Sequence, residues 1–222
     1  MLIAIDGTVC SGKSTVAKKL AKRLGFLYVN TGAIFRAVAY VCNNHKVLPQ
    51  QTEKVSELLK TIDYEQRKNS NNEAVFFVNG RDVTNELYSP LISNLSSCYS
   101  PLPDVREFVR QVQHKIVKNT DAVVEGRDIG SVVFPNADVK FFVTASDDVR
   151  AKRRYNDYLS QGKEVSYENV MKDILERDRQ DMEREISPLV KTEDAILFIN
   201  DYNSPEPAVD KMEELVREKI KI

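Results

Sequence analysis

One short stretch near the start of the chain has the residue types and spacing that bind phosphate. It reads G-T-V-C-S-G-K-S-T and satisfies the pattern G-x-x-x-x-G-K-[ST]. The glycines allow a tight turn in which successive backbone N–H groups point inward and form a concave site for an anion. Lys13 can reach the β- and γ-phosphates of a nucleotide, and the hydroxyl of Ser14 can bind Mg²⁺. The motif therefore predicts a site for a nucleoside triphosphate, made by Gly7, Thr8, Val9, Cys10, Ser11, Gly12, Lys13, Ser14 and Thr15.

The residues on either side of this motif predict the strand and the helix that must hold it. Residues 2–6 form a nearly continuous apolar run, which is typical of a strand buried on both faces. Behind the motif, apolar residues recur at helical spacing: Val16, Ala17, Leu20, Ala21 and Leu24. The positive end of such a helix favours a bound phosphate. Because Lys13 must neutralise phosphate charge, we expect it to be reachable by solvent and not part of the core.

The length and composition indicate one α/β domain with a large core. The chain has 222 residues and a formal net charge of −1, from 32 basic and 33 acidic side chains, so we expect neither nucleic acid nor a membrane as a partner. The chain has three cysteines, Cys10, Cys42 and Cys98, which are widely spaced and form no C-x-x-C motif. This favours a reducing compartment over a disulfide framework or a zinc site. No apolar run approaches membrane-spanning length, and no signal peptide precedes the first strand. We expect a soluble, cytoplasmic monomer.

Strand and helix patterns alternate along most of the chain. A short second strand is predicted at residues 27–29, buried strands at 122–124 and 139–144, and a last strand of the sheet at 195–200. Helices are predicted around residues 34–41, 55–62, 85–119 with a break near 100–103, 147–185 with a break at 161–163, and 209–220. Asp104 is placed to cap the helix that follows the first break. The expected fold is α/β, with a parallel sheet wrapped by helices, and its ligands should bind beyond the carboxyl ends of the strands.

One segment, residues 63–83, departs from this alternation. It contains a polar turn cluster at residues 69–72, an alternating apolar run at 74–78, and then Asn79-Gly80, a strong signal for a hairpin. The segment therefore predicts a small antiparallel β insertion that does not continue the parallel sheet.

Charged clusters follow the predicted strands at residues 30–36 and 125–128, and another lies on a predicted helix at residues 176–184. The helical cluster is also what a solvated helix face with i,i+4 ion pairs would look like. Phosphoryl transfer, however, requires positive groups around several phosphate oxygens, and the fork of an arginine suits them.

Taken together, these motifs resemble the bacterial cytidylate kinase family, which belongs to the P-loop nucleoside monophosphate kinases. The resemblance rests on residues 7–15, T-G-A-I-F-R at 31–36, G-R-D-I-G at 126–130, and R-D-x-x-D-x-x-R at 177–184, in this order and spacing. It implies transfer of the γ-phosphoryl group of ATP to CMP or dCMP, with Mg²⁺. It also implies one kinase domain over residues 1–222, in which a core (1–30, 104–146 and 186–222) carries a monophosphate-binding region with the β insertion (31–103) and a short helical lid with charged helices (147–185).

The resemblance also implies roles for individual residues. Three arginines would hold the acceptor phosphate: Arg36, Arg127 and Arg184. The cytosine would be recognised by Ser97, Arg106 and Asp128, and the acceptor site would be completed by Thr31 and by Asp181 at the ribose. Four arginines would surround the transferred phosphoryl group from the lid: Arg150, Arg153, Arg154 and Arg177. The implied catalytic residues are Lys13, Arg127, Arg153 and Arg177.

The chain departs from the family pattern in three places. Asn30 and Glu125 stand where aspartates are common, although Glu125 can still orient water bound to Mg²⁺. The loop residues 8–11 differ from the proline and small residues that the family often has there. One of them, Cys10, lies at a helix N-terminus beside Lys13, where the pKa of a thiol can be lowered; an unreactive loop residue is the other interpretation.

Two alternatives to this function remain open at this point. The first is another small-molecule P-loop kinase, acting on uridylate, adenylate, shikimate or gluconate. The second is a regulatory GTPase or nucleotide-dependent binding switch. Such proteins read guanine with N-K-x-D, a sequence that is absent from this chain.

Overall fold

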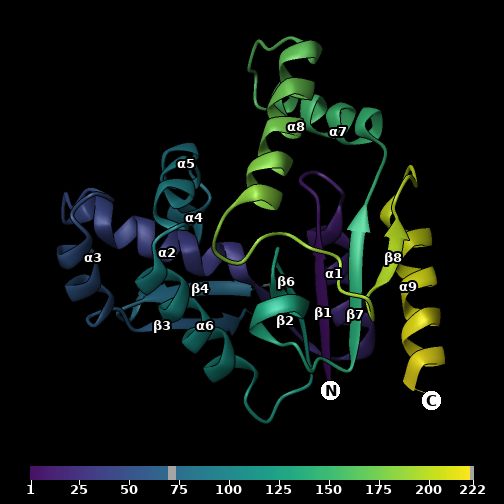
Figure 1. The fold of residues 1–222 in the computed structure, drawn as a ribbon, viewed down its shortest axis with the longest axis horizontal. Coiled ribbons are helices and arrows are strands. Elements are labelled where there is room, and N and C mark those ends of the chain that lie inside the picture. Colours follow the sequence, from purple (N-terminus) through teal and green to yellow (C-terminus); the bar gives the residue numbers. More distant parts are fainter. Residues whose placement is uncertain (70–73, 221–222) are drawn as a thin grey trace. The chain divides into compact units, whose positions relative to one another are not determined.

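The computed structural model describes residues 1–69 and 74–220, and the chain divides into two compact units (Figure 1). The first, called the core unit here, contains Met1–Tyr28 and Thr120–Ile222. The second, called the inserted unit, contains Val29–Asn119. The chain passes from one to the other within strand β2 (Leu27–Asn30). Each unit is described by itself.

The core unit is built from alternating strands and helices. Besides β2, its elements in chain order are β1 (Leu2–Gly7), α1 (Lys13–Leu24), β6 (Ala122–Glu125), the π-helical turn η1 (Ile129–Val133), β7 (Val139–Thr144), α7 (Asp147–Ser160), α8 (Tyr167–Glu183), β8 (Ile196–Ile199) and α9 (Pro205–Ile220). The strands form one sheet in the order β2-β6-β1-β7-β8. β1 pairs in parallel with β6 and β7, and β7 pairs in parallel with β8. The predicted parallel sheet is therefore confirmed.

Apolar side chains from the sheet and from two helices make the core of this unit. Ile3 and Ile5 of β1 and Phe141 of β7 are fully or almost fully buried against the apolar faces of α1 and α9. The continuous apolar strands require cover on both faces, which explains why helices flank them. β1 lies in the middle of the sheet, so its carboxyl end at Gly7 lies at the centre of the edge where ligands of such sheets bind.

The charged stretch after β7 forms two helices, as the break at residues 161–163 predicts. α7 ends at Ser160 and α8 begins at Tyr167, and between them Gly162 has a φ of 70°, a conformation that favours glycine. Ser166 caps α8, because its side chain accepts a hydrogen bond from the N–H of Asn169. Figure 1 shows this helical pair beyond the carboxyl end of β7.

The inserted unit combines helices with a small antiparallel sheet. Its elements are α2 (Thr31–Asn44), α3 (Thr52–Leu59), β3 (Tyr64–Lys68), β4 (Ala74–Val78), β5 (Arg81–Asp82), α4 (Thr84–Leu87), α5 (Pro90–Tyr99) and α6 (Pro103–Val117). The sheet has the order β3-β4-β5, and both strand pairs are antiparallel. Asn79 and Gly80 have φ values of 50° and 77°, the left-handed pair of a type I′ hairpin turn. The predicted β insertion is confirmed; of its predicted turn cluster, residues 70–72 lie outside the described residues.

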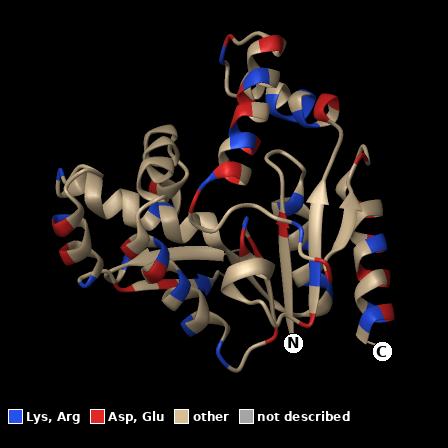
Figure 2. Ribbon diagram, viewed as in Figure 1, with Lys and Arg blue, Asp and Glu red and all other residues tan. Residues whose placement is uncertain are grey.

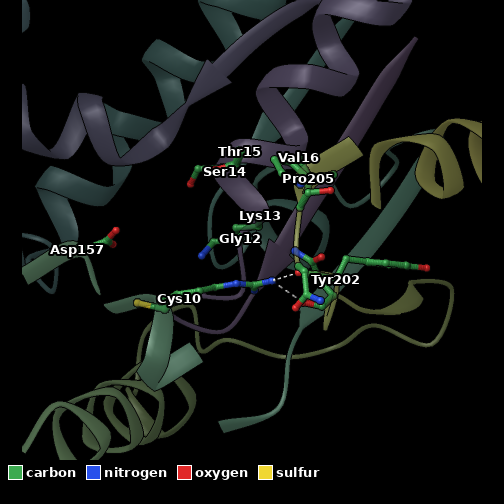
Figure 3. A pocket seen from close by; sticks show the side chains of 13 residues that line it. Cys10, Gly12, Lys13, Ser14, Thr15, Val16, Asp157, Tyr202 and Pro205 are labelled. Carbon is green, nitrogen blue, oxygen red and sulfur yellow. Dashed lines mark hydrogen bonds between the residues drawn. The ribbon is translucent and has the colours of Figure 1, made fainter. Parts of the chain in front are cut away.

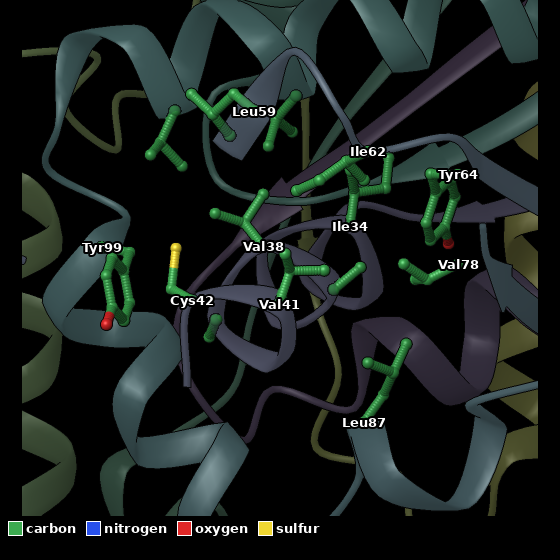
Figure 4. Close-up of a cluster of buried hydrophobic side chains, with 14 of the residues drawn as sticks. Ile34, Val38, Val41, Cys42, Leu59, Ile62, Tyr64, Val78, Leu87 and Tyr99 are labelled. Carbon is green, nitrogen blue, oxygen red and sulfur yellow. The ribbon is translucent and has the colours of Figure 1, made fainter. Parts of the chain in front are cut away.

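The inserted unit has its own apolar core (Figure 4). Side chains of α2, including Ile34, Val38 and Cys42, belong to the same apolar cluster as Leu59 at the end of α3 and Tyr99 at the end of α5. None of the helices within residues 1–69 and 74–220 is both long and apolar enough to cross a membrane.

Three details of the predicted helices differ from the structure. A second break separates α4 from α5, because Ser89 caps α5 by accepting from the N–H of Ile92 and Pro90 takes the first helical position. Asp104 does not cap α6, since the helix begins at Pro103 and the Asp104 carboxylate accepts from the hydroxyl of Ser56. The domain boundaries from the sequence put residues 104–119 in the core, whereas α6 packs on α2 and α3 in the inserted unit.

Candidate active site

The phosphate loop links the carboxyl end of β1 to the N-terminus of α1, as the motif predicts. A side chain at Gly7 would place its Cβ 1.9 Å from the carbonyl oxygen of Val143 on β7, so only glycine fits there. Gly12 has a φ of 81°, and a Cβ there would lie 2.6 Å from Nδ2 of Asn200. The two motif glycines are therefore required by close packing and by a left-handed turn.

Lys13 is buried, which corrects the expectation that it is reachable by solvent. Lys13 is 6% exposed, and its Nζ donates a hydrogen bond to the carbonyl of Thr8 at 3.1 Å. Burial, together with the positive charge of Arg127, lowers the pKa of Lys13 from 10.5 to about 8. The carbonyl of Thr8 points toward the ammonium group of Lys13, which explains how the loop can hold a charged side chain in its interior.

A cavity of about 390 Å³ opens beside the loop (Figure 3). One side is made by residues 10 and 12–16 of the loop and α1, and another by Arg153 and Asp157 of α7. The remaining wall is the segment after β8, residues 200 and 202–205. Lys13 lines this cavity although it is buried, so a ligand there can reach it.

Two residues of this wall, Asn200 and Tyr202, were not predicted as part of the site. Asn200 Nδ2 donates to the carbonyl of Ser11 at 2.7 Å, which ties the end of β8 to the phosphate loop. The carbonyl groups of Asn200 and Tyr202 each accept from Nη2 of Arg153 at 2.9 Å. The signal was present in the sequence, because Asn200 is the polar residue at the carboxyl end of the strand predicted at residues 195–200.

Ser14 and Glu125 lie together, as a shared magnesium site requires. Ser14 Oγ donates to Oε1 of Glu125 at 3.0 Å, and the hydroxyl of Tyr28 also donates to Oε1 at 3.3 Å. A hydroxyl and a carboxylate are oxygen ligands of the kind that Mg²⁺ prefers, and the ion commonly keeps several waters. The residues present therefore fit Mg²⁺, and Glu125 can serve where the family often has aspartate.

A cluster of acidic and basic side chains joins the strand end at β6 to α8. Arg127 Nε donates to Asp181 at 2.7 Å, and Arg177 and Arg184 lie 3.9 and 3.7 Å from the same carboxylate. Arg184 also lies 3.7 Å from Asp128. Burial alone would raise the pKa of Asp181, but the arginines hold it below its ordinary value. The structure thus brings together all five of these predicted residues.

This cluster separates the two interpretations of the charged helix. Figure 2 shows acidic and basic residues along α8. One part of α8 is a solvated face, where exposed Arg179 pairs with Glu176 and Glu183. Asp178 and Asp181, in contrast, are 5% and 6% exposed and face inward. Both interpretations therefore hold, each for a different face of the helix.

The backbone after Arg127 and Asp128 is held by one buried carboxylate. Asp6, the last residue before Gly7, accepts hydrogen bonds from the N–H groups of Ile129 and Gly130 at 2.8 and 2.7 Å. Burial raises the pKa of Asp6 to about 6, although these two hydrogen bonds act against the increase. The π-helical turn that begins here was not predicted from the sequence, and such turns are frequent at functional sites.

The lid arginines have different surroundings. Arg153 lines the cavity, and its Nη1 is buried without a hydrogen-bond partner among residues 1–69 and 74–220. Arg154 stacks over the ring of Tyr158, 4.4 Å from its centre. Arg150 is 3% exposed and bonds to Asp147, Asp178 and the backbone of the phosphate loop. Its terminal nitrogens are therefore engaged in the protein.

The other predicted acceptor residues belong to the inserted unit. Arg36 lies over the ring of Tyr88, 4.6 Å from its centre, and Thr31 accepts a hydrogen bond from Gln113 at 2.8 Å. Arg106 donates to the carbonyl of Ser100, whose hydroxyl donates to the carbonyl of Ser97, so Arg106 and Ser97 share a neighbour. Asn30 caps α2 through the N–H of Ala33, a role that needs no charge.

The surroundings of Cys10 do not favour a reactive thiol. Burial raises the pKa of Cys10 above its ordinary value of 9.0, and the nearby cations Arg154 and Lys13 do not reverse the shift. The lowered pKa that its place beside Lys13 suggested is therefore wrong.

Comparison with known proteins adds an independent observation. Residues 3–218 match the model of a protein family described as cytidylate kinase. A cytidylate kinase of Thermosipho melanesiensis is 42% identical over 99% of this chain and 98% of its own, and one of Geobacillus sp. is 44% identical over 98% and 97%. In fold, the chain is similar to a shikimate kinase from Bacteroides thetaiotaomicron, with a TM-score of 0.50, 12% identity, and coverage of 100% of this chain and 99% of the other.

Proposed function

Since the chain belongs to the cytidylate kinase family, we propose that it transfers the γ-phosphoryl group of ATP to CMP or dCMP, which gives ADP and CDP or dCDP. The observation that carries the proposal is the arrangement at the carboxyl edge of the core sheet. There the phosphate loop, Ser14 with Glu125, and the arginine cluster around Asp181 belong to the same unit.

On the donor side, the amides of the phosphate loop and Lys13 would hold the triphosphate. The cavity between α7 and residues 200–205 would receive the rest of the nucleotide, and Arg153 has a buried guanidinium nitrogen at its wall. Ser14 and Glu125 would hold Mg²⁺, directly and through water, and the ion would neutralise charge on the phosphates.

On the acceptor side, Arg127 and Arg184 of the core unit and Arg36 of the inserted unit would bind the monophosphate. Asp128 would accept a hydrogen bond from the exocyclic N4 amino group of cytosine, which uracil replaces with a carbonyl oxygen. The remaining acceptor contacts would come from Thr31, Ser97, Arg106 and, at the ribose, Asp181.

Catalysis in this proposal needs no covalent intermediate. Lys13, Arg127, Arg153 and Arg177 would neutralise the charge that spreads over the transferred phosphoryl group, while the two nucleotides are held in line. Their side chains would be fixed before the reaction by partners in the protein, such as Asp181 for Arg127 and the carbonyls of Asn200 and Tyr202 for Arg153. Exclusion of water by the protein would prevent hydrolysis of ATP.

A panel of acceptors tests the proposal. The release of ADP from ATP should be slow alone and should increase on addition of CMP or dCMP, and less with UMP, AMP, shikimate or gluconate. Lys13→Ala is the matched control, since it removes a phosphate-binding charge that lies in the loop. Equal turnover with and without CMP, or a preference for shikimate, would contradict the proposal.

We also propose that the enzyme acts as a cytoplasmic monomer on small molecules. The near balance of 32 basic and 33 acidic residues and the three unpaired cysteines support this. The molar mass in solution at working concentration tests the monomer, and cell fractionation tests the location.

A further inference from the structure

Arg150 and Asp178 form an ion pair that the proposed reaction does not use. Arg150 is on α7 and Asp178 is on α8, and they are only 3% and 5% exposed. Arg150 Nη2 also donates to Asp147 at 2.5 Å. The desolvation of two buried charges is costly, and such a pair often stabilises a fold no better than well-packed apolar side chains would. Its contribution to stability is therefore a weak reason for its presence.

Both members of the pair bind the same residue of the phosphate loop. Asp178 Oδ1 accepts from the N–H of Val9 at 2.8 Å, and Arg150 Nη1 donates to the carbonyl of Val9 at 3.1 Å. The two backbone polar groups of Val9 are thus both satisfied by side chains from the helical pair.

Val9 is placed where the loop needs such support. It lies between Gly7 and Gly12, and the next residue, Cys10, has a φ of 56° although it is not glycine. A residue with a side chain pays a conformational penalty in this region, so neighbouring contacts must hold the loop there. The hydrogen bonds to Val9 come from outside the loop, from side chains of α7 and α8.

We propose that Arg150 and Asp178 are positioning residues that hold the phosphate loop in its nucleotide-binding conformation and couple it to α7 and α8. This inference rests on the proposed function of the loop as the ATP site. It assigns Arg150 to the support of the loop, because both of its terminal nitrogens are engaged with Asp178, Asp147 and Val9.

The first test compares nucleotide affinities of variants at position 178. Asp178→Ala removes the acceptor for the Val9 N–H and should weaken ATP binding by about tenfold or more, as expected for a lost hydrogen bond to a charged group. Asp178→Asn retains an oxygen acceptor and should lose less. The dissociation constants of ATP and CMP are measured separately by calorimetry, well below the melting temperature of each variant.

Arg179→Gln is the matched control, because Arg179 is on the same helix but pairs with Glu176 and Glu183 at the surface. It should leave both affinities within about twofold of the wild type, the scale of an exposed pair. The proposal is overturned if folded Asp178→Ala binds ATP as the wild type does, or if CMP binding weakens as much as ATP binding. Failure of the wild type to bind ATP at all would instead refute the proposed function.

A double variant separates positioning from stability. In Arg150→Met with Asp178→Leu, apolar side chains replace both charges, so the melting temperature should recover much of what Asp178→Ala loses. The ATP affinity should stay weak, because no side chain then bonds to Val9. If ATP affinity recovers together with the melting temperature, the pair only supports the fold and the positioning role is refuted.

Discussion

ATP binding should weaken steeply when the pH is raised from 7 to 9, because Lys13 loses its proton in the unliganded enzyme. Burial and the nearby Arg127 lower the pKa of Lys13 from 10.5 to about 8. The bound phosphates favour the ammonium form, so only the protonated enzyme binds ATP well. The other groups that act on Lys13, namely Glu125, Cys10 and Asp181, favour its charge but do not restore the ordinary pKa.

The size of the effect follows from this pKa. With a pKa of about 8, the protonated fraction falls from about 0.91 at pH 7 to about 0.09 at pH 9, so the apparent dissociation constant should rise about tenfold. An exposed lysine of ordinary pKa would change it by only about 3% over the same range. The phosphates of ATP themselves change charge nearer pH 6 and so contribute little above pH 7.

The assay is calorimetric titration of ATP without an acceptor, at constant ionic strength, at pH values from 7 to 9. Lys13→Arg is the control, because a guanidinium stays charged throughout this range and should give a flat profile, whatever its absolute affinity. Uptake of a proton on binding, measured in buffers of different ionisation enthalpy, should be largest near pH 9. A wild-type profile as flat as that of Lys13→Arg would refute the argument that burial has lowered the pKa of Lys13.

Three further predictions concern other residues. Tyr88→Leu should raise KM for CMP by about fivefold, because it removes the ring over which Arg36 lies. KM for ATP and the stability should change little, since Tyr88 is exposed. Tyr88→Phe should behave as the wild type, and equal effects on KM for CMP and for ATP would contradict this prediction. Asp128→Ala should lower kcat/KM for CMP far more than for UMP, and an unchanged ratio in the active variant would remove Asp128 from base recognition. Asp6 has a folded pKa of about 6, above its unfolded value of 3.8, so its contribution to the free energy of unfolding is fully present below pH 4 and declines by about 3 kcal/mol as the pH rises through 6. Asp6→Asn should lack this decline in urea unfolding between pH 4 and 7, and parallel pH profiles for the two proteins would refute it.

Most of the fold could be predicted because its local signals agree with one another. The apolar run of β1, the glycine motif and the helical spacing of α1 all indicate the same strand, loop and helix. The hairpin at Asn79-Gly80 was equally plain, since both residues must adopt positive φ and both readily do.

The features that were missed depend on contacts between distant parts of the chain. Lys13 is buried with its ammonium bonded to the carbonyl of Thr8, and its pKa is lowered by this burial and by the charge of Arg127; periodicity in the sequence reports neither. The engagement of Arg150 follows from Asp178, far along the sequence on another helix. The sequence indicates which residue types can bind phosphate, but which arginine meets a ligand and which meets a carboxylate is decided by tertiary packing.

The two hydrogen bonds of Asp6 have a consequence for the spacing of the two substrates. Asp6 is covalently joined to the phosphate loop through Gly7, and it holds the backbone that follows Arg127 and Asp128, which we propose to bind the acceptor. Together with the pairing of β1 with β6 and the hydrogen bond from the N–H of Gly126 to the carbonyl of Ile5, Asp6 therefore fixes the distance between these two segments inside the core unit. Arg36 and Arg106, which we propose to bind the acceptor, belong to the inserted unit, so we expect substitutions there to leave this distance in the core unit unchanged.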